Sequence, residues 1–215
     1  MRVERSMHPG WLSNAYLVWD EGTREAFFVD SGAPLDPLAA TVERKRLDVR
    51  RLLTTHGHHD HVAGDDELAG RYGVRSERSA PGVEAIATPG HSDDHLVFVL
   101  DGLCFSGDLL FRDAVGGGPD AGVIRDSVLR VLELPDETRV LPGHTEETTI
   151  ARERAENPFV RYWLGEAAAI DERVRVAGED AVLLVWSPDY DGNGKALVRF
   201  ADGREAIVGG SRVER

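Results

Sequence analysis

The segment Thr-His-Gly-His-His-Asp-His at residues 55–61 constrains the fold most, because it places four potential metal ligands within six residues. These are His56, His58, Asp60 and His61. The segment follows Val49–Thr55, whose strand character predicts that the cluster lies on a loop at the end of a strand. On an extended loop, alternation lets the first two ligands face one position and the last two face a second. The motif therefore predicts a fold in which one strand end serves two adjacent cations.

Three further candidate ligands each follow a strand-like run and a glycine. They are His91 after Gly90, Asp108 after Gly107, and His144 after Gly143. A glycine in front of a ligand permits a positive φ and a close approach of the backbone to a metal. Imidazole and carboxylate ligands together suit zinc, iron or manganese, and the absence of thiolate argues against a purely structural zinc site.

The remaining histidines and nearby acids fit no ligand position. We interpret His8, His59 and His95 as surface or supporting histidines, and Asp93 and Asp94 as loop or helix-start residues. Asp30, in the turn Asp30-Ser31-Gly32, is expected either to orient a ligand histidine through its other ring nitrogen or to cap local backbone amides.

Hydrophobic periodicity and turn residues predict alternating strands and helices up to about residue 165. The expected strands are Asn14–Trp19 and Ala26–Val29, which form a hairpin, then Val49–Thr55, Val83–Thr88, Leu96–Leu100, Leu103–Ser106 and Arg139–Leu141. The expected helices are Leu35–Arg46, Asp65–Tyr72, Ile124–Leu134, Thr148–Asn157 with a hydroxyl cap, and a segment from Pro158 toward Trp163.

After Gly165 the pattern changes to short β-segments. A short helix is expected over Glu166–Arg173, followed by strands at Ala181–Trp186, Ala196–Phe200 and Glu205–Val208, with Gly-rich turns between them. About five short strands in this part are typical of a small SH3-like barrel. The sequence thus predicts a catalytic domain at 1–165 and a small β-rich domain at 175–215.

Composition limits the classes of partner. The chain has 215 residues, 41% of them hydrophobic, which is enough for one buried α/β domain and a small appendage. A formal net charge of −13 gives no electrostatic footprint for nucleic acid or an anionic membrane. No apolar run is long enough for a membrane span and no secretory signal is recognisable, so a cytoplasmic protein is expected.

The single cysteine, Cys104, lies in an apolar run and is expected to be buried.

The ligand blocks in this order resemble the metallo-β-lactamase superfamily, and more narrowly its glyoxalase II-like, or hydroxyacylglutathione hydrolase-like, branch. Flanking segments extend the resemblance to about residues 10–164: Asn14–Leu17, Val29–Gly32, Gly107–Phe111, Thr148–Ile150 and Asn157–Phe159. The resemblance implies a four-layer αββα sandwich with the site at one edge of two sheets. It also implies two divalent metal ions, most readily zinc, with iron or manganese as alternatives.

Carried over by position, the resemblance places His56, His58 and His91 on the first metal. It places Asp60, His61 and His144 on the second, and Asp108 between the two. The expected reaction is hydrolysis of a small-molecule thioester or related ester by a hydroxide shared by both metals. Asp60 would orient this hydroxide and act as the catalytic carboxylate. A thioester is suitable because its thiolate leaves without a strong general acid.

Two departures from the branch leave glutathione open as the substrate, beside other thioesters, lactones and esters. Relatives commonly carry an arginine or lysine in the loop after the bridging aspartate, where this chain has Val115–Pro119. Arg112 lies nearby and could replace that cation or be a solvated surface residue. The helical C-terminal region of larger relatives is replaced here by the β-rich segment.

Other functions are weighed against this one. The main competitor is a persulfide dioxygenase with one iron on His56, His91 and Asp108. The β-rich segment could instead be a binding module, recruiting a partner or forming a homo-oligomer. β-Lactam hydrolysis and RNA processing are weaker alternatives within the superfamily, and fold alone does not decide among them.

Overall fold

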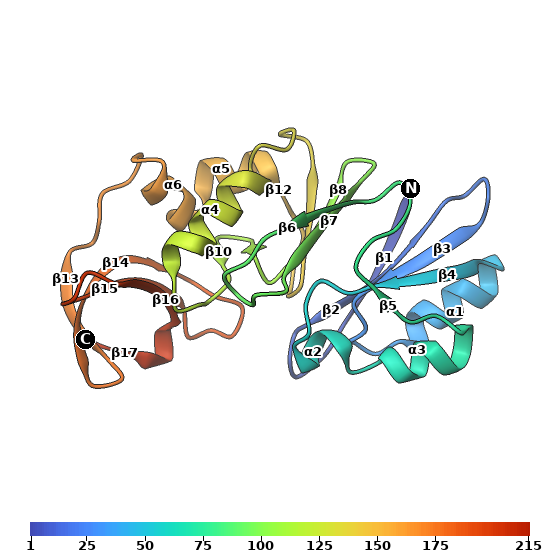
Figure 1. The fold of residues 1–215 in the computed structure, drawn as a ribbon, viewed down its shortest axis with the longest axis horizontal. Helices are drawn as coiled ribbons and strands as arrows, with labels where there is room; N and C mark the ends of the chain where they lie inside the picture. Colours follow the sequence, from blue (N-terminus) through green and yellow to red (C-terminus); the bar gives the residue numbers. More distant parts are fainter.

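Two five-stranded sheets face each other at the centre of the molecule, as the computed structural model, which describes residues 1–215, shows (Figure 1). Buried side chains from both sheets meet between them, among them Tyr16, Val18, Phe98 and Phe105. Helices α1 and α3 cover the outer face of the first sheet, and α4, α5 and α6 lie beyond the second. The predicted four-layer α/β sandwich is therefore confirmed.

The first sheet has the order β1-β2-β3-β4-β5. Its strands are β1 (Arg2–Met7), β2 (Asn14–Trp19), β3 (Glu25–Val29), β4 (Asp48–Leu53) and β5 (Ser76–Glu77). Every residue of β2 is buried because the strand is apolar on both faces. Tyr16 and Val18 point toward the second sheet, whereas Leu17 and Trp19 pack on the helical side, as the alternation of a strand requires.

The helices of the first half are α1 (Asp36–Lys45), α2 (His59–Val62) and α3 (Asp65–Tyr72). Leu38 and Val42 of α1, four residues apart, are both buried against the first sheet, together with Leu68 of α3. The short α2 had no counterpart among the predicted elements. It directly follows β4 and its loop, and so begins within the histidine cluster.

The second sheet has the order β12-β11-β8-β7-β6. Its strands are β6 (Glu84–Ala87), β7 (Leu96–Leu100), β8 (Leu103–Gly107), β11 (Arg139–Pro142) and β12 (Thr148–Thr149), and a separate small hairpin joins β9 (Leu110–Phe111) to β10 (Ala114–Val115). The outer helices are α4 (Ala121–Val131), α5 (Ile150–Glu156) and α6 (Pro158–Trp163). Side chains of Asp120, Thr149 and Asn157 accept hydrogen bonds from the first turns of these three helices, so each helix begins at a polar cap.

The predicted helix over Glu166–Arg173 is wrong. Residues 166–171 form no helix, and β13 begins at Glu172. The backbone amides of Ile170 and Asp171 instead donate to the carbonyls of Leu184 and Leu183. Docking along β14 thus outweighs the helix propensity of the alanine-rich stretch, which is only a weak preference.

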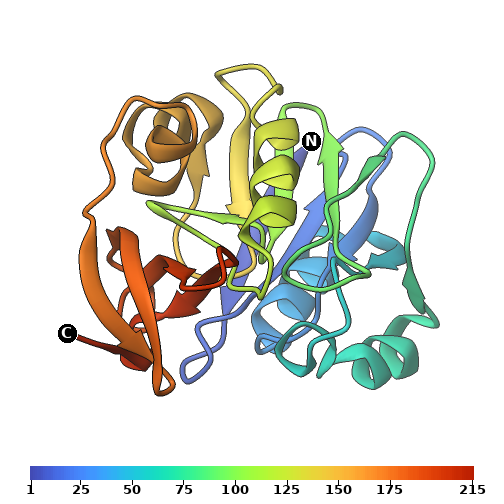
Figure 2. The same ribbon diagram turned by 60° about the vertical axis from the view of Figure 1, so that its left-hand side comes forward.

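A third sheet occupies the C-terminal end of the chain and is curled, as Figures 1 and 2 show. Its order is β16-β15-β14-β13-β17. The strands are β13 (Glu172–Val176), β14 (Glu179–Ser187), β15 (Lys195–Phe200), β16 (Glu205–Gly209) and β17 (Val213–Glu214), with a short 3₁₀ helix η1 (Gly210–Arg212) before the last. One face has a small apolar cluster of its own. Leu184, Leu197 and Ile207 join the large apolar cluster formed with α4, α5 and α6.

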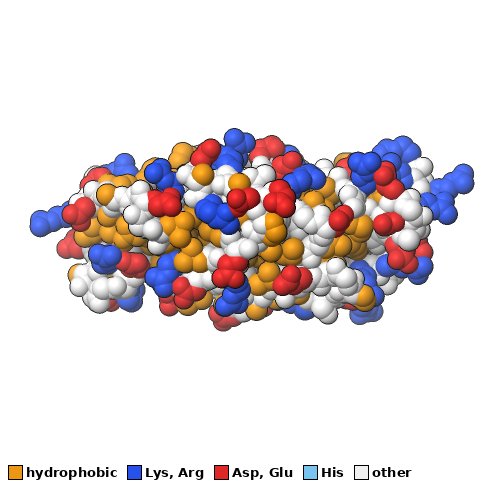
Figure 3. Space-filling model, turned by 90° about the horizontal axis from the view of Figure 1, so that it is seen from above, with side chains coloured by type: hydrophobic (Ala, Val, Ile, Leu, Met, Phe, Trp, Pro, Cys, Tyr) orange, Lys and Arg blue, Asp and Glu red, His pale blue; other side chains and the backbone are white.

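The surface carries basic and acidic side chains side by side on the face drawn in Figure 3. No helix in the structure combines the length and apolar character needed to cross a bilayer.

Candidate metal centre

The structure brings all seven predicted ligands together at the ends of strands from both central sheets. His56 and His58 lie on the loop after β4, and Asp60 and His61 lie on α2. The other three follow β6, β8 and β11, as the glycine-preceded positions predicted. Three overlapping groups of potential ligand atoms lie within 4.8 Å: His56, His58 and His91; His56, His61 and Asp108; and Asp60, His61 and His144.

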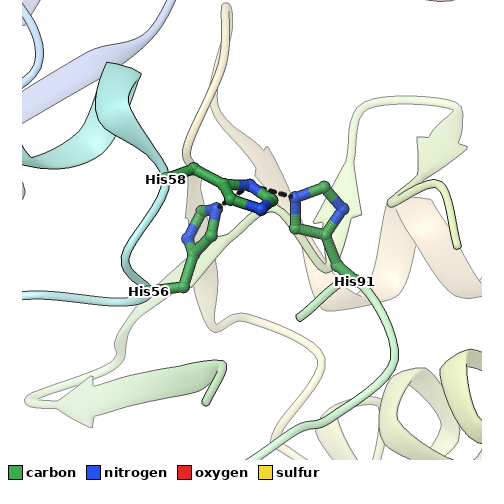
Figure 4. Close-up of side chains that lie close together, drawn as sticks. All are labelled: His56, His58 and His91. Carbon is green, nitrogen blue, oxygen red and sulfur yellow. Dashed lines mark hydrogen bonds between the residues drawn. The ribbon is translucent and has the colours of Figure 1, made fainter. Parts of the chain in front are cut away.

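The first group consists of three imidazoles that point toward one another (Figure 4). Nδ1 of His58 lies 3.0 Å from Nε2 of His56 and 3.0 Å from Nε2 of His91. Nitrogen lone pairs at this spacing form one face of a coordination sphere, which suits a cation of the zinc or iron type.

The third group, which consists of Asp60, His61 and His144, combines a carboxylate with two imidazoles. Oδ2 of Asp60 lies 3.4 Å from Nε2 of His144 and 3.8 Å from Nε2 of His61. His61 and His144 are buried, whereas the Asp60 side chain is 31% exposed. Asp60 is therefore the member of this group that faces the open side of the site.

Asp108 lies between the first and third groups and reaches both. Its Oδ1 is 3.2 Å from Nε2 of His61, and its Oδ2 is 3.5 Å from Nε2 of His91 and 3.4 Å from Nε2 of His144. Nε2 of His61 and Oδ1 of Asp108 are buried and have no hydrogen-bond partner. Buried polar atoms without partners are unfavourable, and a cation at this position would satisfy both. The donor set thus fits divalent metal ions.

The second ring nitrogens of four histidines are held by the surrounding structure. Nδ1 of His61 donates to Oδ2 of Asp30 at 2.9 Å. Nδ1 of His91 donates to the carbonyl of Gly117 at 3.0 Å, and Nδ1 of His144 donates to that of Trp11 at 3.1 Å. Nδ1 of His56 is hydrogen-bonded to Oγ1 of Thr55 at 3.1 Å. Such contacts fix the tautomer that presents Nε2 toward a metal.

Asp30 takes the first of the two roles that the sequence left open, because it orients a ligand histidine, whereas the backbone amide that it also accepts belongs to the distant Thr55. Its Oδ2 accepts from His61, and its Oδ1 accepts from the backbone amide of Thr55 at 2.8 Å. The Thr55 hydroxyl also donates to Oδ2 of Asp30, at 2.8 Å. One buried carboxylate therefore orients His61 and ties the end of β4 to the loop that carries the histidines.

Two glycines next to ligands are required for different reasons. Gly107 has φ +48°, a conformation that side chains rarely adopt. At Gly143, a Cβ atom would lie 2.3 Å from Oδ1 of Asp108 and 2.7 Å from Cε1 of His61. The close approach predicted from the sequence thus holds at this second position even though its φ is not positive.

The electrostatics divide the histidines into neutral and charged members. Burial lowers the pKa of His56 to about 4 and also lowers the pKa of His91. Burial likewise opposes a charge on His144, but Asp108 and Asp60 outweigh it and raise its pKa to about 9. The hydrogen bond from His144 lowers the pKa of Asp60 to about 2. His56 and His91 therefore offer free lone pairs at neutral pH, and Asp60 is ionised.

The remaining candidates lie where a supporting or surface role would place them. His95 is buried, and its Nε2 accepts the backbone amide of Asp108 at 3.0 Å, so it supports the centre. His59 is exposed and His8 partly so. Asp94 accepts from the hydroxyl of Ser92 at 2.7 Å and lies outside the ligand groups, as does Asp93.

Two aromatic residues at the centre were missed by sequence reasoning. Trp11 supplies the carbonyl that holds His144, from the loop between β1 and β2. Tyr190 stacks on the His144 ring at 4.2 Å between centroids and 3° between planes. No local signal distinguishes Trp11, and Tyr190 lies in a turn-rich stretch 46 positions after His144, so only the folded chain connects them.

Comparisons with known proteins agree with this architecture. The family model described as metallo-beta-lactamase superfamily matches residues 8–81 and 75–144. A protein named hydroxyacylglutathione hydrolase from Alkalilimnicola ehrlichii is 31% identical over 199 residues, which cover 77% of this chain and 76% of the relative.

Solved structures show the same fold. TTHA1623 in a di-iron-bound form is 30% identical, with a TM-score of 0.63 over 72% of this chain and 98% of the other. The BLEG-1 B3 metallo-beta-lactamase is 24% identical, with a TM-score of 0.68 over 74% of this chain and 99% of the other. The chain therefore belongs to the metallo-β-lactamase superfamily, in its hydroxyacylglutathione hydrolase-like branch, and is a metal-dependent hydrolase of that fold.

Proposed function

We propose that the protein hydrolyses a thioester or a related ester at a centre of two divalent cations, most readily zinc. The observation that carries this proposal is the position of Asp108, whose two carboxylate oxygens face different ligand groups. A carboxylate shared in this way is expected where two cations lie side by side.

The proposed ligand sets follow the first and third groups. His56, His58 and His91 would hold one cation, Asp60, His61 and His144 would hold the other, and the carboxylate of Asp108 lies within reach of both sets. When bound, the cations would polarise a substrate carbonyl and lower the pKa of water enough to supply a nucleophile near neutral pH.

Asp60 is proposed as the catalytic carboxylate. Its low pKa keeps it ionised, and its partial exposure leaves it accessible to a water molecule on the open side. An ionised carboxylate there accepts a hydrogen bond from the attacking water and so orients it toward the carbonyl carbon. A thiolate leaving group needs no strong general acid, which agrees with a site made of ligands and one orienting carboxylate.

The relatives named hydroxyacylglutathione hydrolase support an acyl-thioester substrate, but the thiol is not carried over from their name because the loop after Asp108 differs in this chain. In the loop where relatives carry a cation, this chain has three glycines, and the structure explains two of them. A Cβ on Gly116 would lie 2.0 Å from the carbonyl oxygen of Asp108, and one on Gly118 would lie 2.4 Å from that of Gly90. The loop is thus packed too tightly for side chains at these two positions.

Metal analysis combined with an assay of thiol release tests the proposal. We expect about two equivalents of zinc per chain after loading and release of thiol from short acyl thioesters, and Asp60→Asn should lower kcat while most of the metal is retained. Asp126→Asn, at an exposed position on α4, is the matched control. Loss of both metals in Asp60→Asn, or no thiol release by fully loaded wild type, would contradict the proposed roles.

The second candidate function is an iron-dependent persulfide dioxygenase, with His56, His91 and Asp108 as iron ligands. TTHA1623, which is 30% identical to this chain, has a structure in a di-iron-bound form, so iron is kept as a candidate metal for this chain as well. Stoichiometric iron together with oxygen uptake in the presence of glutathione persulfide would establish this function instead of the hydrolase.

A further inference from the structure

One wall of the metal centre comes from the C-terminal sheet. Residues 188–194 join β14 to β15 and carry Tyr190, whose ring lies nearly parallel to that of His144. Phe111, from the hairpin β9–β10, packs edge-to-face with the ring of Tyr190, at 5.6 Å between centroids. Tyr190 therefore lies beside a candidate ligand although it belongs to a segment outside the family match at 8–144.

A buried ion pair fixes this wall. Oδ1 of Asp189 accepts the backbone amide of Tyr190 at 2.9 Å. Oδ2 of Asp189 pairs with Nζ of Lys195 at 2.9 Å, and the two side chains are only 3% and 11% exposed. This ion pair, which is shielded from solvent, ties the residue next to Tyr190 to the start of β15.

A groove of about 200 Å³ runs beside Tyr190. Its polar lining comes from three segments: Arg112 and Asp113, Thr145 and Glu146, and Asp189 and Tyr190. Thr145 directly follows His144 in the chain, and Tyr190 stacks on the ring of His144, so two lining residues of the groove lie beside this candidate ligand.

The charges of the groove leave one cation without a partner. Asp113 pairs with Arg152 at 2.9 Å, Glu146 with Arg5 at 3.3 Å, and Asp189 with Lys195. Each acid of the lining is thus neutralised, whereas Arg112 is exposed and forms no ion pair. The phenol of Tyr190 makes no hydrogen bond in the structure and is a donor at neutral pH.

We propose that this groove is a subsite for a carboxylate on the substrate, bound by the guanidinium of Arg112 and the hydroxyl of Tyr190. A guanidinium offers paired N–H donors that match the two oxygens of a carboxylate, and a phenol adds a third donor. The inference rests on the proposed function, since it makes the substrate an anionic acyl thioester whose charged end extends from the metal centre past His144.

Binding of two non-hydrolysable probes tests the subsite separately from turnover. The probes are short thioethers that are identical except that one ends in a carboxylate and the other in a carboxamide. Calorimetry on the zinc-loaded protein should show about tenfold tighter binding of the carboxylate. Arg112→Gln should reduce this preference to less than threefold, and Tyr190→Phe, which keeps the stacked ring, should reduce it by a few fold.

Arg161→Gln is the matched control, because Arg161 is an exposed arginine of α6 that lies outside the groove. It should retain the wild-type preference, and all variants should retain the wild-type zinc content. An undiminished preference in Arg112→Gln, or equal binding of both probes by wild type, would overturn the subsite.

The two proposals fail in different ways. If the loaded wild type prefers the carboxylate probe through Arg112 but releases no thiol from any thioester, the subsite stands and the hydrolase function falls. If thioesters are cleaved but their KM values do not depend on the carboxylate or on Arg112, the hydrolase stands and the subsite falls.

Discussion

His61 has both ring nitrogens facing carboxylates within the protein interior. Asp30 accepts from its Nδ1, and Asp108 lies opposite its Nε2. A supporting carboxylate fixes the ring and raises the basicity of the ligating nitrogen. The contribution of Asp30 can therefore be measured by replacing Asp30 while every candidate metal ligand is kept.

Replacing Asp30 should weaken metal binding although Asp30 holds no metal. We expect Asp30→Asn to lower zinc affinity about 10- to 100-fold, because the amide keeps the shape but removes the charge that supports His61. Competition with a chelator of known affinity measures the change, and Asp66→Asn, exposed on α3, serves as the control. Unchanged affinity in Asp30→Asn would show that the contact with His61 is not coupled to metal binding.

His95 should make the metal-free protein less stable in mild acid. Burial, followed by the nearby His56, lowers the pKa of His95 to about 3, whereas an unfolded chain has a value near 6.5. The unfolded state therefore takes up the proton first, and stability falls as the pH drops from 6.5 toward 3. At pH 5 this amounts to about 2 kcal/mol.

Urea unfolding of metal-free protein at pH 7 and pH 5 measures this effect. His95→Gln keeps an acceptor for the amide of Asp108 and removes the titrating group, so it should lose less stability between the two pH values. Parallel losses in the variant and the wild type would assign the acid sensitivity to other groups.

The site was predictable from sequence to the extent that its chemistry is local. His56, His58, Asp60 and His61 lie within one short segment, and the three distant ligands share a preceding glycine. Tyr190 has no such marker, because its contact with His144 exists only through the packing of β14 and β15 on the rest of the chain.

At the scale of elements, strands with two apolar faces or clear alternation were predicted, such as β2 and β7. β1 was missed because Arg2–Met7 carries three charged residues among its six positions and pairs only with β2. The tiny strands β9 and β10 have two residues each, and so carry no periodic signal at all.

The turn between β11 and His144 should tolerate no side chain. Gly143→Ala places a methyl group against Asp108 and His61, and we expect loss of at least one zinc equivalent and a destabilisation of about 1–3 kcal/mol. Zinc content and urea unfolding check this.

Gly70→Ala is the matched control for that substitution. A Cβ at Gly70, within α3, meets nothing within 4 Å, so alanine there should raise stability by about 0.5–1 kcal/mol and leave the zinc content unchanged. Equal zinc content in both variants would show that the close packing at Gly143 is not needed by the centre.

At the scale of the whole molecule, the C-terminal sheet shares its apolar packing with the second central sheet. We propose the division at 1–165 and 175–215 as two units along the chain, with Leu184, Leu197 and Ile207 packed into the large cluster. A chain ending at residue 165 would expose the partners of these side chains to water.

Truncation after Gly165 tests how far the two units depend on each other. We expect the shortened chain to aggregate or to melt at least 10 °C below the full chain, because it loses the apolar cover of α4 and α6. Ile207→Ala provides a milder change and should cost about 2–5 kcal/mol. A shortened chain that is monomeric, folded and zinc-loaded would show instead that residues 1–165 are an independent domain.

The backbone pairing of Gly118 with Ile207 has a consequence for the order in which the centre is completed. Gly118 exchanges both amide–carbonyl bonds with Ile207, at 2.9 and 3.0 Å, while its neighbour Gly117 holds His91. Because synthesis runs from the N-terminus, all seven candidate ligands are added to the chain before Tyr190 and Ile207. The loop that holds His91 is therefore paired with Ile207 only after all the candidate ligands are present in the chain. The position of this loop beside the centre is fixed last, when the final hairpin of the C-terminal sheet forms.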